Sequence, residues 1–156
     1  YQENKSISPE TIIHIYTICE HMLMMSLYSE VYRRSRTINS EMDNIYHIKA
    51  TQYKQEILPS PDIVNCLNTL VDKKTATQKV SVLLKTCNLI TDKKNIGCDD
   101  LLIAFVNNLV KSNIKYPFTE FLIIDTLLPS GLKGKEAYAL STFQASSQYI
   151  ATYGNF

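Results

Sequence analysis

The sequence carries almost no excess of charge of either sign. Lys and Arg number 16, Asp and Glu number 15, and the formal net charge is +1. Proteins that bind nucleic acid through the phosphate backbone usually show a marked basic excess, so the composition argues against a nucleic-acid partner. With 156 residues, 45% of them hydrophobic and 20% charged, the chain is expected to form one globular domain over residues 1–156.

Long apolar runs are also absent. No stretch approaches the length of a membrane span, and no signal-peptide pattern opens the chain, so no direct membrane insertion is predicted. The chain begins at Tyr1 rather than Met, and we expect it to be a piece of a longer, multidomain protein. Residues 1–7 are polar and are expected to be frayed.

Cysteine pairs with metal-binding spacing are missing. None of the three histidines has a cysteine partner at ligand spacing, so no metal site is predicted. Three of the four cysteines lie in apolar stretches, as small core residues do, which indicates a reducing, cytoplasmic compartment. The four are widely spaced: Cys19, Cys66, Cys87 and Cys98.

Alternating strand patterns, Gly-rich phosphate loops and tandem repeats are not found, whereas helical spacing of apolar residues recurs throughout. Ser8 and Pro9 predict the start of a long amphipathic helix that ends near Arg34, with its methionines as core fillers. Arg33, Arg34 and Arg36 are expected at its C-terminal end. Its expected core face is a stripe of eight residues: Ile12, Ile15, Tyr16, Cys19, Met22, Leu23, Leu27 and Val31.

Further helices are predicted from the same spacing. Short ones are expected over residues 40–48, 51–58 and 62–71, and a longer one begins at Thr75 or Thr77, with Lys79 and Lys85 facing outward, before a solvated loop at 92–95. The last three cover residues 99–111, 118–128 and 134–153. The predicted fold class is all-α, a single layered bundle of about six to eight helices.

The helix at residues 99–111 begins with two acids, Asp99 and Asp100, and is apolar around most of its circumference. Such a helix is central to its domain. Carboxylates at a helix start often serve only as caps that accept from unpaired N–H groups. The capping alternative therefore stands beside any functional one, above all for Asp100.

Four short motifs occur in order along the chain. Residues 27–32 (LYSEVY) resemble a helical LYxxVF motif, and residues 75–80 (TATQKV) resemble TPxxKL. Residues 97–103 (GCDDLLI) resemble GADDLLP, and residues 134–141 (GKEAYALS) resemble GExGYYxT. Together they resemble the vacuolar-protein-sorting-nine domain, the exchange-factor module for the Rab-five subgroup of endosomal small GTPases.

This resemblance implies an exchange factor that needs no cofactor and makes no covalent bond with its substrate. It assigns the catalytic roles to Asp99, as the acid that displaces phosphate, and to Tyr138. The family's prolines are replaced by Ile103 and Ala76, and its glutamate is replaced by Lys135. The domain is therefore expected to be a divergent member, peripheral to endosomal membranes on the cytoplasmic side.

Helical spacing extends the expected GTPase-binding surface along both helices. Residues three and four apart share a helix face, so the first helix contributes the positions that follow Asp99, and the last helix those that follow Tyr138. The surface so defined comprises Asp100, Ile103, Val106, Asn107, Ser141, Thr142 and Ala145. The alternative function is a catalytically weakened module that binds a Rab protein as a scaffold in endosomal trafficking.

Overall fold

The computed structural model describes residues 7–55, 57–94, 97–128, 132 and 134–154, which are all-α as predicted, with no strand in these ranges. No helix in the described ranges is long and apolar enough to cross a membrane. The elements are α1 (Pro9–Gln52), α2 (Pro61–Asn68), the 3-10 helix η1 (Thr69–Asp72), α3 (Ala76–Lys94), α4 (Cys98–Lys111), α5 (Pro117–Leu127) and α6 (Lys135–Thr152).

Helix α1 begins as predicted and then continues much further than predicted. The hydroxyl of Ser8 accepts a hydrogen bond from the Thr11 backbone N–H at 3.2 Å, and Pro9 occupies the first helical position. The helix then runs unbroken for 44 residues. The predictions that this helix ends near Arg34 and that separate helices cover residues 40–48 and 51–58 were therefore wrong. No glycine or proline lies between Pro9 and Pro59 to interrupt the helix.

The arginines of α1 make contacts in the middle of the helix rather than at its end. Arg33 and Arg34 pair with Glu30, three and four residues earlier. The Arg36 guanidinium donates to the buried Asp43 carboxylate at 3.1 Å. Asp43 in turn accepts from the Phe118 backbone N–H at 3.0 Å and the Thr119 hydroxyl at 2.6 Å. A side chain from α1 therefore caps the start of α5.

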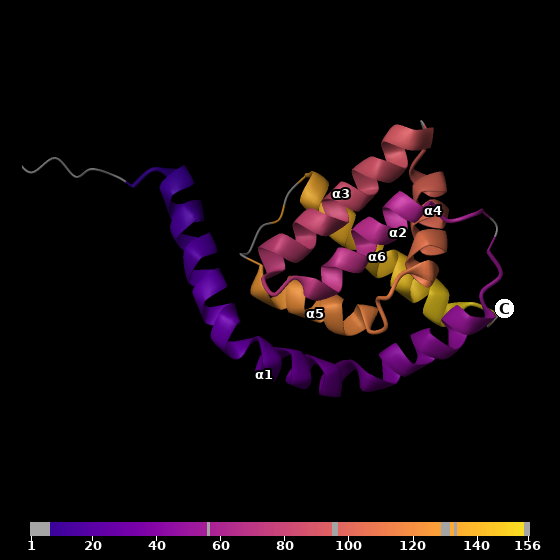
Figure 1. Ribbon diagram of the computed structural model, residues 1–156, viewed down its shortest axis with the longest axis horizontal. Coiled ribbons are helices and arrows are strands. Elements are labelled where there is room, and N and C mark those ends of the chain that lie inside the picture. The colour runs from indigo at the N-terminus through magenta and orange to yellow at the C-terminus, as the bar shows by residue number, and fades with distance from the viewer. Residues whose placement is uncertain (1–6, 56, 95–96, 129–131, 133, 155–156) are drawn as a thin grey trace, which may run out of the picture.

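Helix α1 packs against α5 and α6, and its N-terminal part extends beyond the bundle (Figure 1). This part still touches the bundle, since the Tyr16 hydroxyl donates to the Leu127 carbonyl at 2.6 Å. The apolar stripe predicted as its core face is mostly exposed, including Met22 and Leu23 at 68% and 60%. Cys19 is exposed as well, and Met24 is the only buried methionine of that part. The core prediction was wrong for this part because the bundle covers a narrower and partly polar side of the helix.

Helix α4 lies in the core, as its apolar circumference predicted. Residues 104–109 are all buried, and Phe105 is fully enclosed. The ring of Phe105 meets the ring of Phe143 on α6 edge to face, with centroids 6.4 Å apart. Offset and edge-to-face pairs of this kind add to the stabilisation that apolar burial supplies. This contact fixes how α4 and α6 cross.

Helix α3 begins at Ala76, within one residue of the predicted start at Thr75 or Thr77, and the Thr75 hydroxyl accepts from the Gln78 backbone N–H at 3.2 Å. It extends to Lys94, so the predicted loop is helical over residues 92–94, and Asn95 lies outside the described residues. Lys85 is exposed, as expected. Lys79, predicted to face outward, is instead fully buried.

The buried Lys79 is matched by polar partners. Its ammonium donates to a Glu120 carboxylate oxygen on α5 at 2.6 Å and to the Leu70 carbonyl at 3.1 Å. Burial raises the pKa of Glu120, and the Lys79 charge opposes that rise. Helical periodicity could not identify this lysine as internal, because its partner is 41 residues away along the chain.

Candidate functional site: the exposed edges of α4 and α6

The first turn of α4 follows Gly97, which occupies the N-cap position without a side-chain cap. The Leu101 backbone N–H donates to the Gly97 carbonyl at 3.0 Å. Asp100 is exposed and Ile103 is partly buried, one turn further along. The side chain of Asp99 lies outside the described residues, so its assignment as the displacing acid stays a prediction.

The first turn of α6 depends on a glycine of the fourth motif. Gly134 has φ +70° and ψ −133°, a backbone conformation that side-chain-bearing L residues rarely adopt. Its carbonyl accepts from the Tyr138 backbone N–H at 3.2 Å, which closes the first helical turn. Tyr138 is 44% exposed at this position. The glycine therefore sets where the Tyr138 phenol emerges from the fold.

The side chains beyond Tyr138 divide between the surface and the core. Ser141 and Ala145 are exposed along the same edge of α6. Thr142 is buried, and its hydroxyl donates to the Tyr138 carbonyl at 2.8 Å. Direct contact with a partner through Thr142 is therefore not supported, and this threonine instead belongs to the inner side of the helix.

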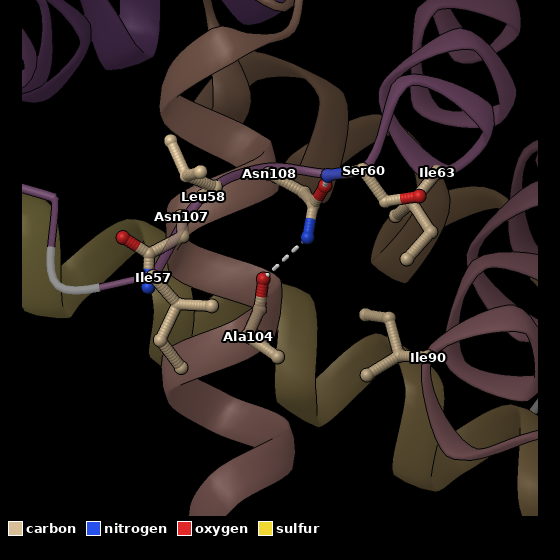
Figure 2. Close-up of a pocket in the computed structure, with 8 residues that line it drawn as sticks. All are labelled: Ile57, Leu58, Ser60, Ile63, Ile90, Ala104, Asn107 and Asn108. Carbon is tan, nitrogen blue, oxygen red and sulfur yellow. Dashed lines mark hydrogen bonds between the residues drawn. The ribbon is translucent and has the colours of Figure 1, made fainter. Parts of the chain in front are cut away.

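Val106 and Asn107 of α4 are also corrected from surface residues to interior ones, at 0% and 1% exposed. The segment that links α1 to α2 covers this side of α4 (Figure 2). Gln55 donates from its side-chain amide to the Asn107 carbonyl at 3.1 Å, and the Ser60 backbone N–H donates to the Asn108 side-chain oxygen at 2.8 Å. Helical spacing alone could not reveal this covering segment.

Tyr149 lies further along this edge. It is 36% exposed and touches Tyr53 edge to face at 6.4 Å between centroids. Tyr138, Ser141, Ala145 and Tyr149 follow one another at spacings of three, four and four residues, so they share one side of α6. Among the described residues of α2–α6, Tyr138 and Tyr149 are the only large hydrophobic side chains that are exposed.

In Figure 1, α4 starts at the C-terminal end of α3, whereas α6 starts behind the earlier part of α3 and runs toward the C-terminus. Asp99 precedes Phe105 by six residues, and Tyr138 precedes Phe143 by five residues. Both positions therefore lie about one and a half turns before the point where the helices touch.

Metal-binding chemistry is not indicated here, since the described part of the chain contains no group of three or more His, Cys, Asp and Glu side chains that could hold an ion. Comparison with known families matched residues 61–155 to the vacuolar sorting protein 9 (VPS9) domain. Searches of curated proteins and of solved structures found no match. The matched region runs from α2 through α6 and covers more than half of the chain, so the protein belongs to the VPS9 domain family.

Proposed function

We propose that this domain is a guanine nucleotide exchange factor that speeds GDP release from an endosomal small GTPase of the Rab-five subgroup. Membership of the VPS9 family implies a small GTPase as partner. The observation that supports the proposal is the exposed Tyr138 in the first turn of α6, which follows the Gly134 turn. A large aromatic side chain held at the surface is typical of an interface anchor.

In the proposed mechanism the domain stabilises the nucleotide-free GTPase. A GTPase holds GDP through its phosphate loop, a lysine on the phosphates and a magnesium ion. A carboxylate from Asp99 would replace the phosphate as the partner of that lysine, and its charge would repel phosphate and disturb the metal site. By linkage, the factor by which the domain weakens nucleotide binding equals the factor by which nucleotide weakens binding of the domain.

The GTPase-facing surface in this proposal has two edges. From α4 it takes Asp100 and Ile103, and from α6 it takes Tyr138, Ser141 and Ala145, all exposed or partly exposed. Tyr149 extends the α6 edge by one further turn. Val106, Asn107 and Thr142 are buried. They would not contact the GTPase but would hold the two helices in place. The complex would form at the cytoplasmic side of endosomal membranes.

The proposal is tested by nucleotide release from GDP-loaded GTPases of the Rab-five subgroup. The wild-type domain should accelerate release, and Asp99→Ala should remove most of that acceleration while leaving the thermal unfolding transition in place. Tyr138→Ala should weaken binding of the nucleotide-free GTPase. If the wild-type domain leaves release rates unchanged across the subgroup, it is not an exchange factor for these proteins.

A second function, a Rab-binding scaffold without catalysis, is favoured by one observation. Lys135, at the family's glutamate position, is exposed at the first residue of α6, one turn before Tyr138. A cation here would compete with the phosphate-loop lysine for the Asp99 carboxylate. A scaffold would bind the GTPase equally well with GDP bound and after Asp99→Ala. Lys135→Glu should raise the release rate if Lys135 limits an active exchange factor.

A further inference from the structure

A cavity opens between the end of α1, the linker that follows it, the end of α4 and the loop that leads to α5. Its walls come from residues 46–55 and 110–115, and its volume is about 460 Å³. That volume lies within the usual range of small-molecule sites in proteins. Lys111, on its wall, follows Asp99 by 12 positions, which is about 18 Å along a helix. The cavity therefore lies toward the other end of α4 from the proposed displacing acid.

The walls of this cavity carry positive charge and no negative charge. Lys111 and Lys115 line it from the α4 side, and His47 lines it from α1. No Asp or Glu is found among its described lining residues, although the chain as a whole has nearly as many acids as bases. A cavity with charge of one sign attracts ions of the opposite sign. The cavity is therefore suited to an anion.

The two lysines are not held by contacts within the fold. Both side chains are exposed. The ion pairs formed within the described part of the chain use other cations, namely Arg33, Arg34, Arg36 and Lys79. A lysine ammonium on its flexible stem has three rotatable donors. Lys111 and Lys115 can therefore turn toward a bound anion without losing an internal ion pair.

The backbone N–H groups after α4 are already used within the fold. The Ser112 N–H donates to the Leu109 carbonyl at 3.1 Å, and the Ile114 N–H donates to the Ser112 hydroxyl at 3.3 Å. The Asn113 N–H donates to the Asn68 side-chain oxygen at 2.8 Å. The C-terminal end of a helix also carries partial negative charge, which disfavours an anion. An anion in this cavity must therefore be held by the lysine side chains.

Buried apolar and aromatic side chains line the same cavity as these exposed lysines. Tyr46, Tyr53 and Ile114 are 2%, 8% and 2% exposed. Such side chains offer contact to the carbon body of a ligand, while the ammonium groups meet its charged part. Lysine binds phosphate well as a point charge. The combination fits an organic phosphate better than a bare inorganic ion.

We propose that this cavity is a binding site for an organic phosphate, held by Lys111 and Lys115 against the side chains of Tyr46, Tyr53 and Ile114. A soluble inositol or sugar phosphate and the headgroup of a phosphorylated lipid both present this chemistry. The inference does not depend on the proposed exchange activity, since no residue of the cavity belongs to the GTPase-facing edges of α4 and α6.

The test is binding of the full chain to two probes at physiological ionic strength, so that weak surface attraction is screened. Inositol trisphosphate is titrated and followed by calorimetry and by the amide NMR signals of the chain. Vesicles of nine parts phosphatidylcholine to one part phosphatidylinositol phosphate are tested by co-sedimentation, with pure phosphatidylcholine as the blank. The wild-type chain should bind at least one probe, and inositol trisphosphate should shift amide signals of residues 46–55 and 110–115.

Two variants remove or oppose the positive charge. The double variant Lys111→Gln with Lys115→Gln should weaken binding roughly tenfold or more, since a charge-assisted contact is lost at each position. Asn113→Asp is nearly isosteric and adds a negative charge at an exposed position of the cavity wall, so it should weaken binding as well. All three side chains are exposed, and the thermal unfolding transition should therefore stay in place.

The matched control is the double variant Lys73→Gln with Lys85→Gln. These two lysines line a cavity of about 430 Å³ beside α3, and their removal changes the net charge by the same amount. The control should bind as the wild-type chain does. An equal loss of binding in the control would show a general attraction to positive charge and would overturn the proposal.

The two probes separate the sources of the phosphate. Binding of inositol trisphosphate alone identifies a soluble ligand, and binding of the vesicles alone identifies a lipid headgroup; either result supports the site if Lys111→Gln with Lys115→Gln abolishes it. A wild-type chain that binds neither probe, or binds an acidic polyglutamate peptide equally well, contradicts an organic-phosphate site.

Discussion

The Lys79 ammonium and the Glu120 carboxylate lie 2.6 Å apart, with side-chain exposures of 0% and 2%. The pair joins α3 to α5, and the Lys79 nitrogen also lies 5.5 Å from the centroid of the Tyr28 ring on α1. Burial and then the Glu120 charge raise the pKa of the neighbouring Tyr32 to about 12. Lys79 of the motif at residues 75–80 therefore lies close to Tyr28 and Tyr32 of the motif at residues 27–32, in one polar cluster.

Removing one member of this ion pair should be far more damaging than removing both. Lys79→Met leaves the Glu120 carboxylate buried without its counter-charge, which should lower the free energy of unfolding by about 3–5 kcal/mol. The double variant Lys79→Met with Glu120→Leu should recover much of that loss, because no uncompensated charge remains. Urea denaturation of the wild-type chain, the Lys79→Met and Glu120→Leu single variants and the double variant measures the coupling energy between the two side chains. Strictly additive losses would show that the two side chains do not act as a pair.

The backbone at Gly134 offers a prediction with a control inside the same chain. Gly134→Ala should cost about 1–3 kcal/mol, because alanine is strained at positive φ. Gly97→Ala, at φ −72°, should change stability by no more than about 0.5 kcal/mol. A Cβ at either position meets no atom within 4 Å, so the two variants differ in backbone strain and not in steric contact. Thermal and chemical unfolding measure both.

The same glycine substitution bears on the candidate site. A distorted first turn would displace Tyr138, so Gly134→Ala should also reduce nucleotide release in the proposed exchange reaction. Equal release rates for Gly134→Ala and wild type would show that the position of this turn does not matter for the GTPase.

Blocking the exposed edge of α6 should inhibit exchange without unfolding the domain. Ser141 lies between Tyr138 and Ala145 on that edge, and Ser141→Arg adds a long cation there. We expect release to slow by roughly tenfold or more, as the loss of an interface contact of 1–2 kcal/mol would produce. Ser81→Arg, at an exposed position of α3 that lines a pocket beside α2, is the control. Equal effects of the two variants would contradict the assigned surface.

The pH dependence of Glu30 follows from its arginine partners. Hydrogen bonds from Arg33 and then Arg34 lower the pKa of Glu30 to about 2 in the folded chain, from 4.5. The folded state therefore binds this proton less tightly than the unfolded chain does. The pair stabilises α1 above about pH 4.5, and that contribution is lost as the pH falls toward 2.

An NMR titration of the Glu30 side chain checks this shift. Arg33→Gln should move the Glu30 pKa back toward 4.5, and high salt should do so in part, because the pair is exposed and screened. A pKa near 4.5 in the wild-type chain would contradict the two ion pairs.

The sequence by itself determined which segments become helices and where most of them begin. Ser8 with Pro9, Thr75 and Gly134 are local signals, since each acts on backbone groups within one turn of itself. The four motifs at residues 27–32, 75–80, 97–103 and 134–141 together indicated the family, which the match over residues 61–155 confirmed. The apolar circumference of α4 likewise predicted its central position, because no other environment suits a helix without a polar side.

Only the tertiary structure decided which sides of these helices are covered. Lys79 looked external because its partner Glu120 is distant in sequence, and Asn107 looked available because the segment that covers it belongs to another part of the chain. The N-terminal part of α1 looked like core because burial was inferred from apolar spacing alone. Helical periodicity states which residues share a side, but the packing of distant segments decides whether that side meets protein or solvent.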